Sequence, residues 1–184
     1  KIGRILIDIA KGFGMNVLCY DPYPVSDSGL NYVSLDEIYN QSDIISLHCP
    51  LTKENHHMIN EDSVNKMKKG VMIINTSRGG LIDSKALLEG LKEKKIGSVG
   101  LDVYEEEANL FYRDNSLKII DDDTLSLLIS MPNVIITSHQ AYLTEEALNN
   151  IAEATVKNMD EFFSGEPILN ELCYHCEKQK NPVE

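Results

Sequence analysis

The sequence predicts an α/β fold in which a parallel β-sheet is covered by crossover helices. The first supporting observation is that segments with a helical spacing of apolar residues alternate along the chain with short apolar runs. The second is that these runs are apolar almost throughout, which is typical of strands buried on both faces of a parallel sheet. The third is the length of 184 residues, which is enough for one well-buried domain.

Four helices are indicated by apolar spacing and by capping residues. The first covers residues 2–13, where Ile and Leu recur on one helical face. Ser34 and Glu37 have the spacing of a capping box, which predicts a short helix directly after Ser34. Asp83 can cap a third helix, and a last helix is expected over about residues 145–163.

Five short strands are expected between and after these helices. They cover Met15–Tyr20, Asp43–Leu47, Val71–Asn75, Gly97–Asp102 and Val134–Thr137. The stretch over residues 105–123 has neither helical nor strand spacing. A loop of that length in a compact domain is usually functional or disordered.

Composition and charge exclude several classes of function. The formal net charge of −12 argues against nucleic-acid binding, which requires a basic face. Because the sequence has neither a run of about 20 apolar residues nor a signal-like leader, we expect no membrane contact and a cytoplasmic location. Cys173, His175 and Cys176 lack a second ligand pair, so we expect no metal site and assign these residues no role.

An acidic residue follows the strand predicted over Met15–Tyr20. A carboxylate at this place in a nucleotide-binding unit can accept hydrogen bonds from the adenosine ribose hydroxyls and repel a 2′-phosphate, which favours NAD over NADP. Asp21 is therefore a candidate ribose ligand. It also precedes Pro22, so an ordinary turn residue is an equally good interpretation.

Polar side chains also follow three later strands. Arg78 comes shortly after Val71–Asn75 in a Gly-flanked turn, and Asp102 and Glu107 come at or after the next strand. His139 follows the last strand. Since ligands of open parallel sheets bind beyond the carboxyl ends of the strands, we expect these groups to converge. An Arg fork can bind a carboxylate, and a His beside a carboxylate can act as a general acid.

Five runs of residues together resemble a known family. They are KIGRILIDIAKGFGMNVLCYDPY, SDIISLHCPLTKEN, MKKGVMIINTSRGGLID, KIGSVGLDVYEEE and ITSHQAYLTEEAL, in that order. Their order and spacing resemble the NAD-binding domain of the D-2-hydroxyacid dehydrogenases up to about Glu166. The insert ANLFYRDNSLKIIDDD is similar to that of the D-lactate dehydrogenases of this family. The resemblance implies a Rossmann-type, doubly wound parallel sheet that binds NAD.

The resemblance implies a role for each matching residue. His139 would be the acid/base, Glu107 would hydrogen-bond it, and Arg78 would bind the substrate carboxylate. Asp102 would lie near the nicotinamide and help to orient the ring, and Asp21 would bind the adenosine ribose. A further set would line the cofactor groove: Cys49, Pro50, Asn55, Thr76 and Ser77, with Lys1 and Ile2 at the start of the helix that faces the pyrophosphate.

The chain also departs from the family pattern. Of the glycine fingerprint G-x-G-x-x-G, only the last glycine, Gly3, is present. We therefore expect the first strand and the substrate-binding lobe to be missing from the chain. We divide it into an incomplete NAD-binding domain over residues 1–166 and a C-terminal tail over residues 167–184. A fragment without that strand is expected to be inactive or unstable unless a partner covers its edges.

These observations predict an NAD-dependent enzyme that interconverts D-lactate and pyruvate. Other D-2-hydroxyacid dehydrogenases, of the 2-hydroxyisocaproate, glycerate or phosphoglycerate type, remain alternatives, because much of the substrate pocket would lie on the other lobe. A corepressor-like module that keeps the NAD fold but recruits partners is a second alternative. A remnant that folds only within a larger assembly is a third. The expected partners are a small 2-keto or 2-hydroxy acid and further copies of the chain, as a dimer or tetramer.

Overall fold

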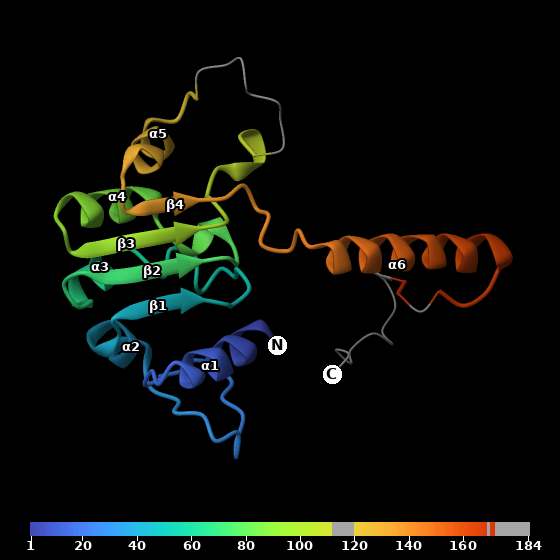
Figure 1. The fold of residues 1–184 in the computed structure, drawn as a ribbon, viewed down its shortest axis with the longest axis horizontal. Helices are drawn as coiled ribbons and strands as arrows, with labels where there is room; N and C mark the ends of the chain where they lie inside the picture. The colour runs from blue at the N-terminus through green and yellow to red at the C-terminus, as the bar shows by residue number, and fades with distance from the viewer. Residues whose placement is uncertain (112–119, 169, 172–184) are drawn as a thin grey trace. The chain divides into compact units, whose positions relative to one another are not determined.

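The computed structural model of the chain describes residues 1–111, 120–168 and 170–171. The chain forms two compact units, Lys1–Ala141 and Tyr142–Glu184. Part of the insert over residues 108–123 and most of the expected tail, including Cys173, His175 and Cys176, lie outside the described residues. The sheet and every candidate catalytic residue belong to the first unit (Figure 1). The division of the chain at residue 166 stays a prediction.

The first unit is built on a parallel sheet of four strands. These are β1 (Ile44–Leu47), β2 (Val71–Asn75), β3 (Ile96–Leu101) and β4 (Val134–Ile136), which lie in that order across the sheet. All three pairings are parallel, with Ile73 of β2 opposite Ile45 of β1 and Val99 of β3. The expected α/β class and parallel sheet are thus confirmed.

The prediction of a strand over Met15–Tyr20 is wrong. Among the described residues this segment forms only an isolated parallel bridge, between Cys19 and Tyr32. Its backbone bonds are Cys19 N–H to the Asn31 carbonyl (2.8 Å) and Val33 N–H to the Cys19 carbonyl (2.9 Å). A strand requires a hydrogen-bonded neighbour along its length, and apolar spacing alone cannot supply one.

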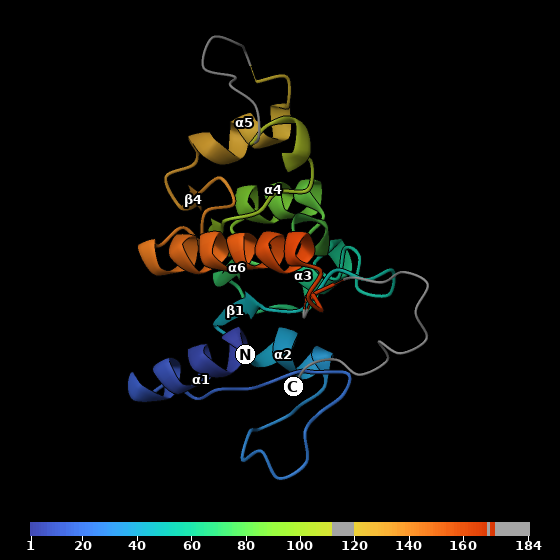
Figure 2. The same ribbon diagram turned by 90° about the vertical axis from the view of Figure 1, so that its right-hand side faces the viewer.

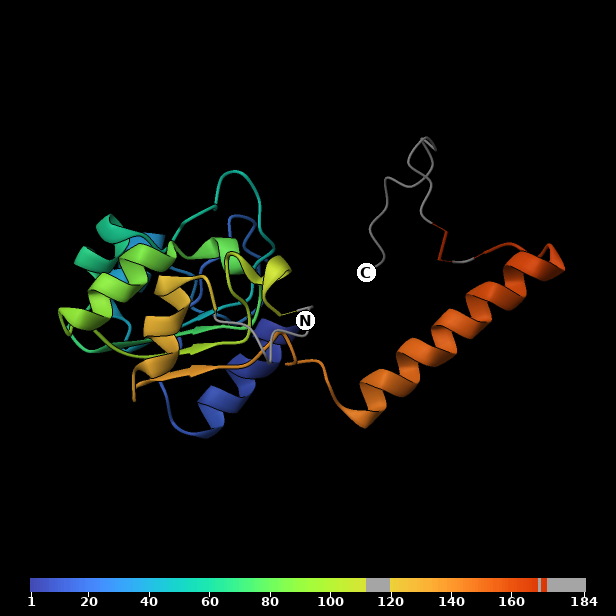
Figure 3. The same cartoon turned by 90° about the horizontal axis from the view of Figure 1, so that it is seen from above.

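Helices cover both faces of the sheet. They are α1 (Ile2–Gly12), α2 (Leu35–Gln41), α3 (Glu61–Lys66), α4 (Ser84–Lys92) and α5 (Asp123–Ser130), with 3₁₀ turns η1 (Gly79–Leu81) and η2 (Glu107–Asn109). Seen from above, α3 and α4 lie on one side of the strands and α1 on the other (Figure 3). This is the doubly wound arrangement that the sequence predicts.

The expected caps are present in the structure. The Ser34 hydroxyl accepts the Glu37 N–H, and the Glu37 carboxylate accepts the Ser34 N–H at 2.9 Å, which forms a complete capping box. Asp83 accepts the N–H groups of Lys85 and Ala86 at the start of α4. Because capping depends on neighbours in sequence, these helix starts could be predicted without knowledge of the tertiary fold.

The core lies between the sheet and the helices on the α4 side. Its most completely buried apolar side chains come from the strands, the helices and the loop before α3: Ile59, Val71, Ile73, Leu81, Leu87, Ile96 and Leu128. Helix α1 differs, since none of its residues is buried and Ile2 and Phe13 are 70% and 78% exposed. The core therefore includes buried side chains of β1, β2 and β3 and packs against Val134 and Ile136 of β4, while α1 contributes no buried residue to it.

The second unit contains α6 (Glu145–Ser164). Thr144 caps its start by accepting the Ala147 N–H, and Gly165 ends it in the left-handed conformation, with φ of 74°. Several large apolar side chains of α6 are more than half exposed, among them Ile151, Val156 and Phe162. Within the described residues, no helix has the length and hydropathy that crossing a membrane would require.

All four strands end at the same edge of the sheet. The register aligns Leu47 with Asn75, Asn75 with Leu101 and Leu101 with Ile136. The arrowheads in Figure 1 point to this edge, and Figure 2 turns it toward the viewer. The loops that carry Arg78, Glu107 and His139 all leave from it, as expected for the ligand-binding edge of an open parallel sheet.

Candidate active site

The structure brings Glu107 and His139 together. Nδ1 of His139 lies 2.9 Å from Oε1 of Glu107, although 32 positions separate the two residues. Both side chains are only partly accessible, at 26% for His139 and 18% for Glu107. The second oxygen, Oε2, accepts the Tyr104 N–H at 3.0 Å. With both oxygens engaged, the carboxylate is fixed in its orientation toward the imidazole ring.

The backbone at His139 is held in an uncommon conformation. Its φ is 54°, in the left-handed region that residues other than glycine rarely adopt. The His139 N–H donates to the Asp102 carbonyl oxygen at 2.6 Å. Positive-φ backbone outside glycine is costly and occurs preferentially at functional sites, where surrounding contacts stabilise it.

Asp102 supplies those surrounding contacts. Its carboxylate accepts hydrogen bonds from the Thr137 hydroxyl, the Gln140 N–H (2.8 Å) and the Ala141 N–H (2.8 Å). Burial raises the pKa of this carboxyl, but these hydrogen bonds and the nearby His139 outweigh burial, and the net effect lowers the pKa. The side chain is 4% exposed. The Asp102 carboxylate is therefore hydrogen-bonded to residues that precede and follow His139 in its loop.

Arg78 lies in a turn that Asn75 organises. Oδ1 of Asn75 accepts the Ser77 N–H at 3.0 Å, and its Nδ2 donates to the Arg78 carbonyl at 2.9 Å. The exposed Arg78 guanidinium donates from Nη1 to the Ser77 carbonyl at 2.7 Å. Sequence reasoning missed Asn75 as a site residue, although a polar side chain that ends an apolar strand is a signal that could have indicated it.

The Arg78 turn packs directly against the loop that carries Glu107. A β-carbon at Gly79 would overlap the backbone of Tyr104 and Glu105, so only glycine fits there. Ser77 ties the same turn to the loop after β1, since its hydroxyl donates to the Cys49 carbonyl at 2.6 Å. The loops after β1, β2 and β3 are thus joined into one surface.

The residues expected to line the cofactor groove have mainly structural contacts. Asn55 accepts the Thr52 N–H and donates to the Pro50 carbonyl, both at 2.7 Å, which shapes the loop after β1. Burial raises the pKa of the half-buried Cys49 thiol. Thr76 is exposed at the end of β2. Their expected contacts with the cofactor stay predictions.

Asp21 follows the Cys19 bridge and is exposed. Its Oδ1 accepts the Tyr23 N–H at 2.8 Å, a contact typical of a turn residue. A carboxylate has room for further hydrogen bonds, so this turn contact is compatible with ribose binding. Both interpretations of Asp21 made from the sequence therefore remain open.

The start of α1 lies beside the loop after β1. A β-carbon at Gly3 would lie 3.5 Å from Cβ of His48, whose Nε2 is 2.9 Å from the Ser46 hydroxyl. Burial lowers the pKa of His48. Lys1 and Ile2 are exposed at this helix start, where backbone N–H groups without intrahelical partners can attract phosphate. These donors and the Asp21 carboxylate fit the chemistry of NAD.

Comparison with known proteins identifies the domain. Residues 1–141 match the family model described as the NAD-binding domain of D-isomer specific 2-hydroxyacid dehydrogenases. The chain is 51% identical to the D-lactate dehydrogenase of Escherichia coli over 94% of its own length and 53% of the relative's. It is 47% identical to an aromatic 2-oxoacid reductase of Clostridium sporogenes over 88% of the chain and 50% of that protein.

A solved structure gives the same match in three dimensions. The D-lactate dehydrogenase of Aquifex aeolicus, complexed with NAD and lactic acid, superposes with a TM-score of 0.81 at 42% identity. The match covers 90% of this chain and 51% of that one. The chain spans about half the length of the curated relatives it matches. The chain thus belongs to the D-isomer specific 2-hydroxyacid dehydrogenase family and contains its NAD-binding domain.

Proposed function

We propose that the protein is an NAD-dependent oxidoreductase that interconverts D-lactate and pyruvate. The observation that carries this proposal is the Glu107–His139 pair, which Asp102 holds at the carboxyl edge of the sheet. The relatives support the same activity, since they include a D-lactate dehydrogenase and a structure with NAD and lactic acid bound.

Substrate binding is assigned to the turn after β2. Arg78 is exposed there, and its planar guanidinium can form two parallel hydrogen bonds with a carboxylate. The fixed turn, organised by Asn75, limits where the guanidinium can reach. We assign Arg78 to the carboxylate of the keto acid, where it would also stabilise charge that develops on the carbonyl oxygen.

Proton transfer is assigned to His139. NADH, when bound, supplies the hydride that reduces the keto carbon. As the carbonyl oxygen becomes negative, Nε2 of His139 donates a proton to it, and in lactate oxidation the same nitrogen accepts the hydroxyl proton. Glu107, which lies 2.9 Å from Nδ1, orients the ring and balances the positive charge of the protonated imidazole.

Replacement of His139 tests the mechanism. In the full-length protein, His139→Asn is expected to lower kcat for pyruvate reduction by about 10²–10⁴-fold, because the proton donor is lost. The Kd for NADH, measured by nicotinamide fluorescence, is expected to stay the same. His175→Asn is the matched control, since it removes an imidazole to which the sequence assigns no role. Unchanged turnover in His139→Asn would contradict the proposal.

A bulkier substrate is the alternative that a specific observation favours. The aromatic 2-oxoacid reductase is almost as similar to this chain as the D-lactate dehydrogenase is. Rates with pyruvate, phenylpyruvate and hydroxypyruvate at equal concentrations would distinguish the two. We expect the highest kcat/KM with pyruvate, and a marked preference for either larger acid would overturn the lactate assignment.

A binding module without catalysis is the other alternative from a different class. The same three substrates test it, because a corepressor-like protein would bind NADH and reduce none of them. The hydrogen bond between Glu107 and His139 supports the enzyme hypothesis instead, since a module that only recruits partners does not require this pair. Absence of NADH binding as well as turnover would favour the remnant that folds only in a larger assembly.

We also propose self-association and a cytoplasmic location. The exposed apolar side chains of α6, such as Ile151 and Phe162, support contact with another copy of the chain. Light scattering of the full-length protein would measure its mass, and a monomer would contradict this proposal. The thiols of Cys19 and Cys49 are free, which is typical of a reducing compartment.

A further inference from the structure

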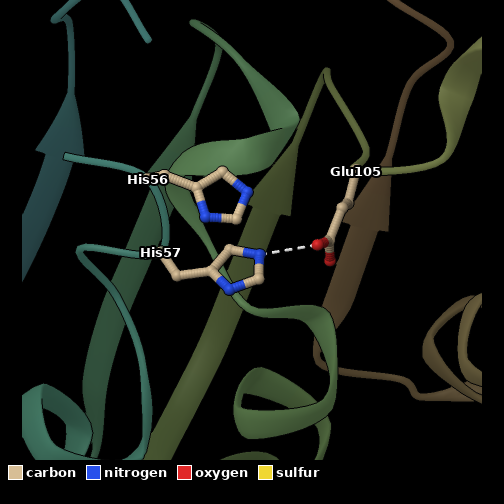
Figure 4. A group of neighbouring side chains, drawn as sticks. All are labelled: His56, His57 and Glu105. Atoms are coloured by element: carbon tan, nitrogen blue, oxygen red, sulfur yellow. Dashed lines mark hydrogen bonds and ion pairs between the residues drawn. The ribbon is translucent and has the colours of Figure 1, made fainter. Parts of the chain in front are cut away.

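A second group of titratable side chains lies beside the candidate active site. His56 and His57 follow one another in the loop before α3, and Glu105 lies in the loop after β3 (Figure 4). Nε2 of His57 is 2.6 Å from Oε1 of Glu105, although 48 positions separate them in sequence. One ligand atom from each of the three side chains lies within 4.8 Å of the other two.

The two imidazole rings lie on the same side of their loop. Their centroids are 3.8 Å apart and their planes are inclined by 28°. His57 has a positive φ of 52°, in the left-handed region that residues other than glycine rarely adopt. Its backbone is held on both sides, because its N–H donates to the Gly80 carbonyl and its carbonyl accepts from Asn60. The arrangement therefore does not depend on the side chains alone.

Glu105 is oriented by a neighbour of its own. Its second oxygen, Oε2, accepts the Ser84 hydroxyl at 3.0 Å, at the start of α4. This contact leaves Oε1 directed at His57. Outer hydrogen bonds of this kind fix metal-binding carboxylates and commonly contribute 10–100-fold to metal affinity, as an order of magnitude. The Glu105 and His57 side chains are only 26% and 30% accessible, so both positions are well defined.

We propose that His56, His57 and Glu105 form a binding site for a divalent transition-metal ion of the Zn²⁺ type. Two imidazole nitrogens and one carboxylate oxygen are a donor set that such ions favour, and water can complete the coordination. The net charge of −12 raises the local concentration of cations. This corrects the expectation of no metal site, which rested on Cys173, His175 and Cys176 and did not consider His57 and Glu105, which are 48 positions apart in sequence.

Side-chain rotations would complete the geometry. Zinc lies about 2.0–2.2 Å from nitrogen and oxygen ligands, which places two ligand atoms of a tetrahedral site roughly 3.3–3.6 Å apart. The 2.6 Å separation between Nε2 of His57 and Oε1 of Glu105 must therefore widen by about 0.7–1.0 Å. The His56 ring must turn out of its stack until its plane contains the ion. This ring is exposed, so rotation about its side-chain bonds is less restricted than that of a buried ring.

Calorimetric titration of the full-length protein with Zn²⁺ tests the site. We expect one equivalent to bind, and we expect the melting temperature to rise with the Zn²⁺ concentration, because binding stabilises the folded state. His56→Ala is expected to weaken binding at least about tenfold. Since His56 is exposed, this change should leave the fold intact. Glu105→Gln retains an acceptor for Ser84 and should weaken binding similarly.

The matched control addresses a second group of side chains of types that can bind metal ions, Cys173, His175 and Cys176. The triple change Cys173→Ser, His175→Asn and Cys176→Ser removes those in the C-terminal tail and should leave the affinity unaltered. Co²⁺ in place of Zn²⁺ should give an absorption spectrum without a thiolate charge-transfer band. The proposal is overturned if His56→Ala and Glu105→Gln bind like the parent protein, or if the triple change abolishes binding.

Discussion

Asp102 shows how one buried side chain can organise the loop that carries His139. Its two oxygens accept three hydrogen bonds from Thr137, Gln140 and Ala141, which surround His139 in sequence. Its own carbonyl accepts the His139 N–H. Donors on both oxygens favour the ionised carboxylate, which explains the lowered pKa despite burial. At the scale of single residues, Asp102 therefore determines where the imidazole lies.

Replacement of Asp102 by Asn should destabilise the protein. The NH₂ group of Asn donates hydrogen bonds and cannot accept them, so it would face the N–H of Gln140 or Ala141 without forming a hydrogen bond. Loss of at least one buried hydrogen bond should lower the free energy of unfolding by about 1–3 kcal/mol at pH 7. Because the folded-state pKa lies below the ordinary 3.8, the ionised Asp102 stabilises the fold fully above that value. The difference in the free energy of unfolding between the parent protein and Asp102→Asn should shrink as the pH falls through the folded-state pKa of Asp102. Urea unfolding across this pH range measures it, and a difference independent of pH would contradict the assignment.

Asp21 can be tested through the choice of cofactor. If its carboxylate binds the ribose, Asp21→Ala should weaken NADH binding and lower the preference for NADH over NADPH by about tenfold, because repulsion of the 2′-phosphate is lost. Fluorescence titration with each cofactor gives the two Kd values. An unchanged ratio would mean that the Tyr23 contact is the whole role of Asp21.

The elements differ in how far sequence could predict them. The caps at Ser34 and Asp83 depend on residues within three positions, so they were predicted correctly. The strand over Met15–Tyr20 was not, because strand formation requires a neighbour that apolar spacing does not reveal. The approach of Glu107 to His139 followed from the rule that parallel strands end at one edge, together with the family resemblance. The same rule brings together the loops after β1 and β3, which carry His57 and Glu105, but it does not indicate which of their side chains meet.

Local stability should also differ between elements. Strand β2 is central, and Ile73 is fully buried, whereas none of the residues of α1 is buried. Amide hydrogens of β2 should therefore exchange at least about a hundredfold more slowly than those of α1, because α1 can open without disrupting the core. Hydrogen exchange of this chain measures both. Equal protection of α1 and β2 would mean that α1 is held by contacts outside this core.

At the scale of the whole molecule, the parallel sheet acts as a support for its loops. The four strands end in register. Ser77 joins the turn after β2 to the loop after β1, and the close approach of Gly79 to Tyr104 joins the same turn to the loop after β3. Each connection fixes one loop relative to the next. The loops that carry Arg78, Glu107 and His139 consequently all lie at the edge where the strands end, which supports the proposal that their side chains act on one substrate.

A crystal structure of the full-length protein with NADH and oxamate, an analogue of pyruvate, would test the proposed roles of His139 and Arg78 directly. We expect Nε2 of His139 to lie within hydrogen-bond distance of the oxamate carbonyl oxygen, about 2.6–3.2 Å, and Arg78 to contact the oxamate carboxylate. Oxamate bound elsewhere, or His139 and Arg78 turned away from it, would rule these roles out.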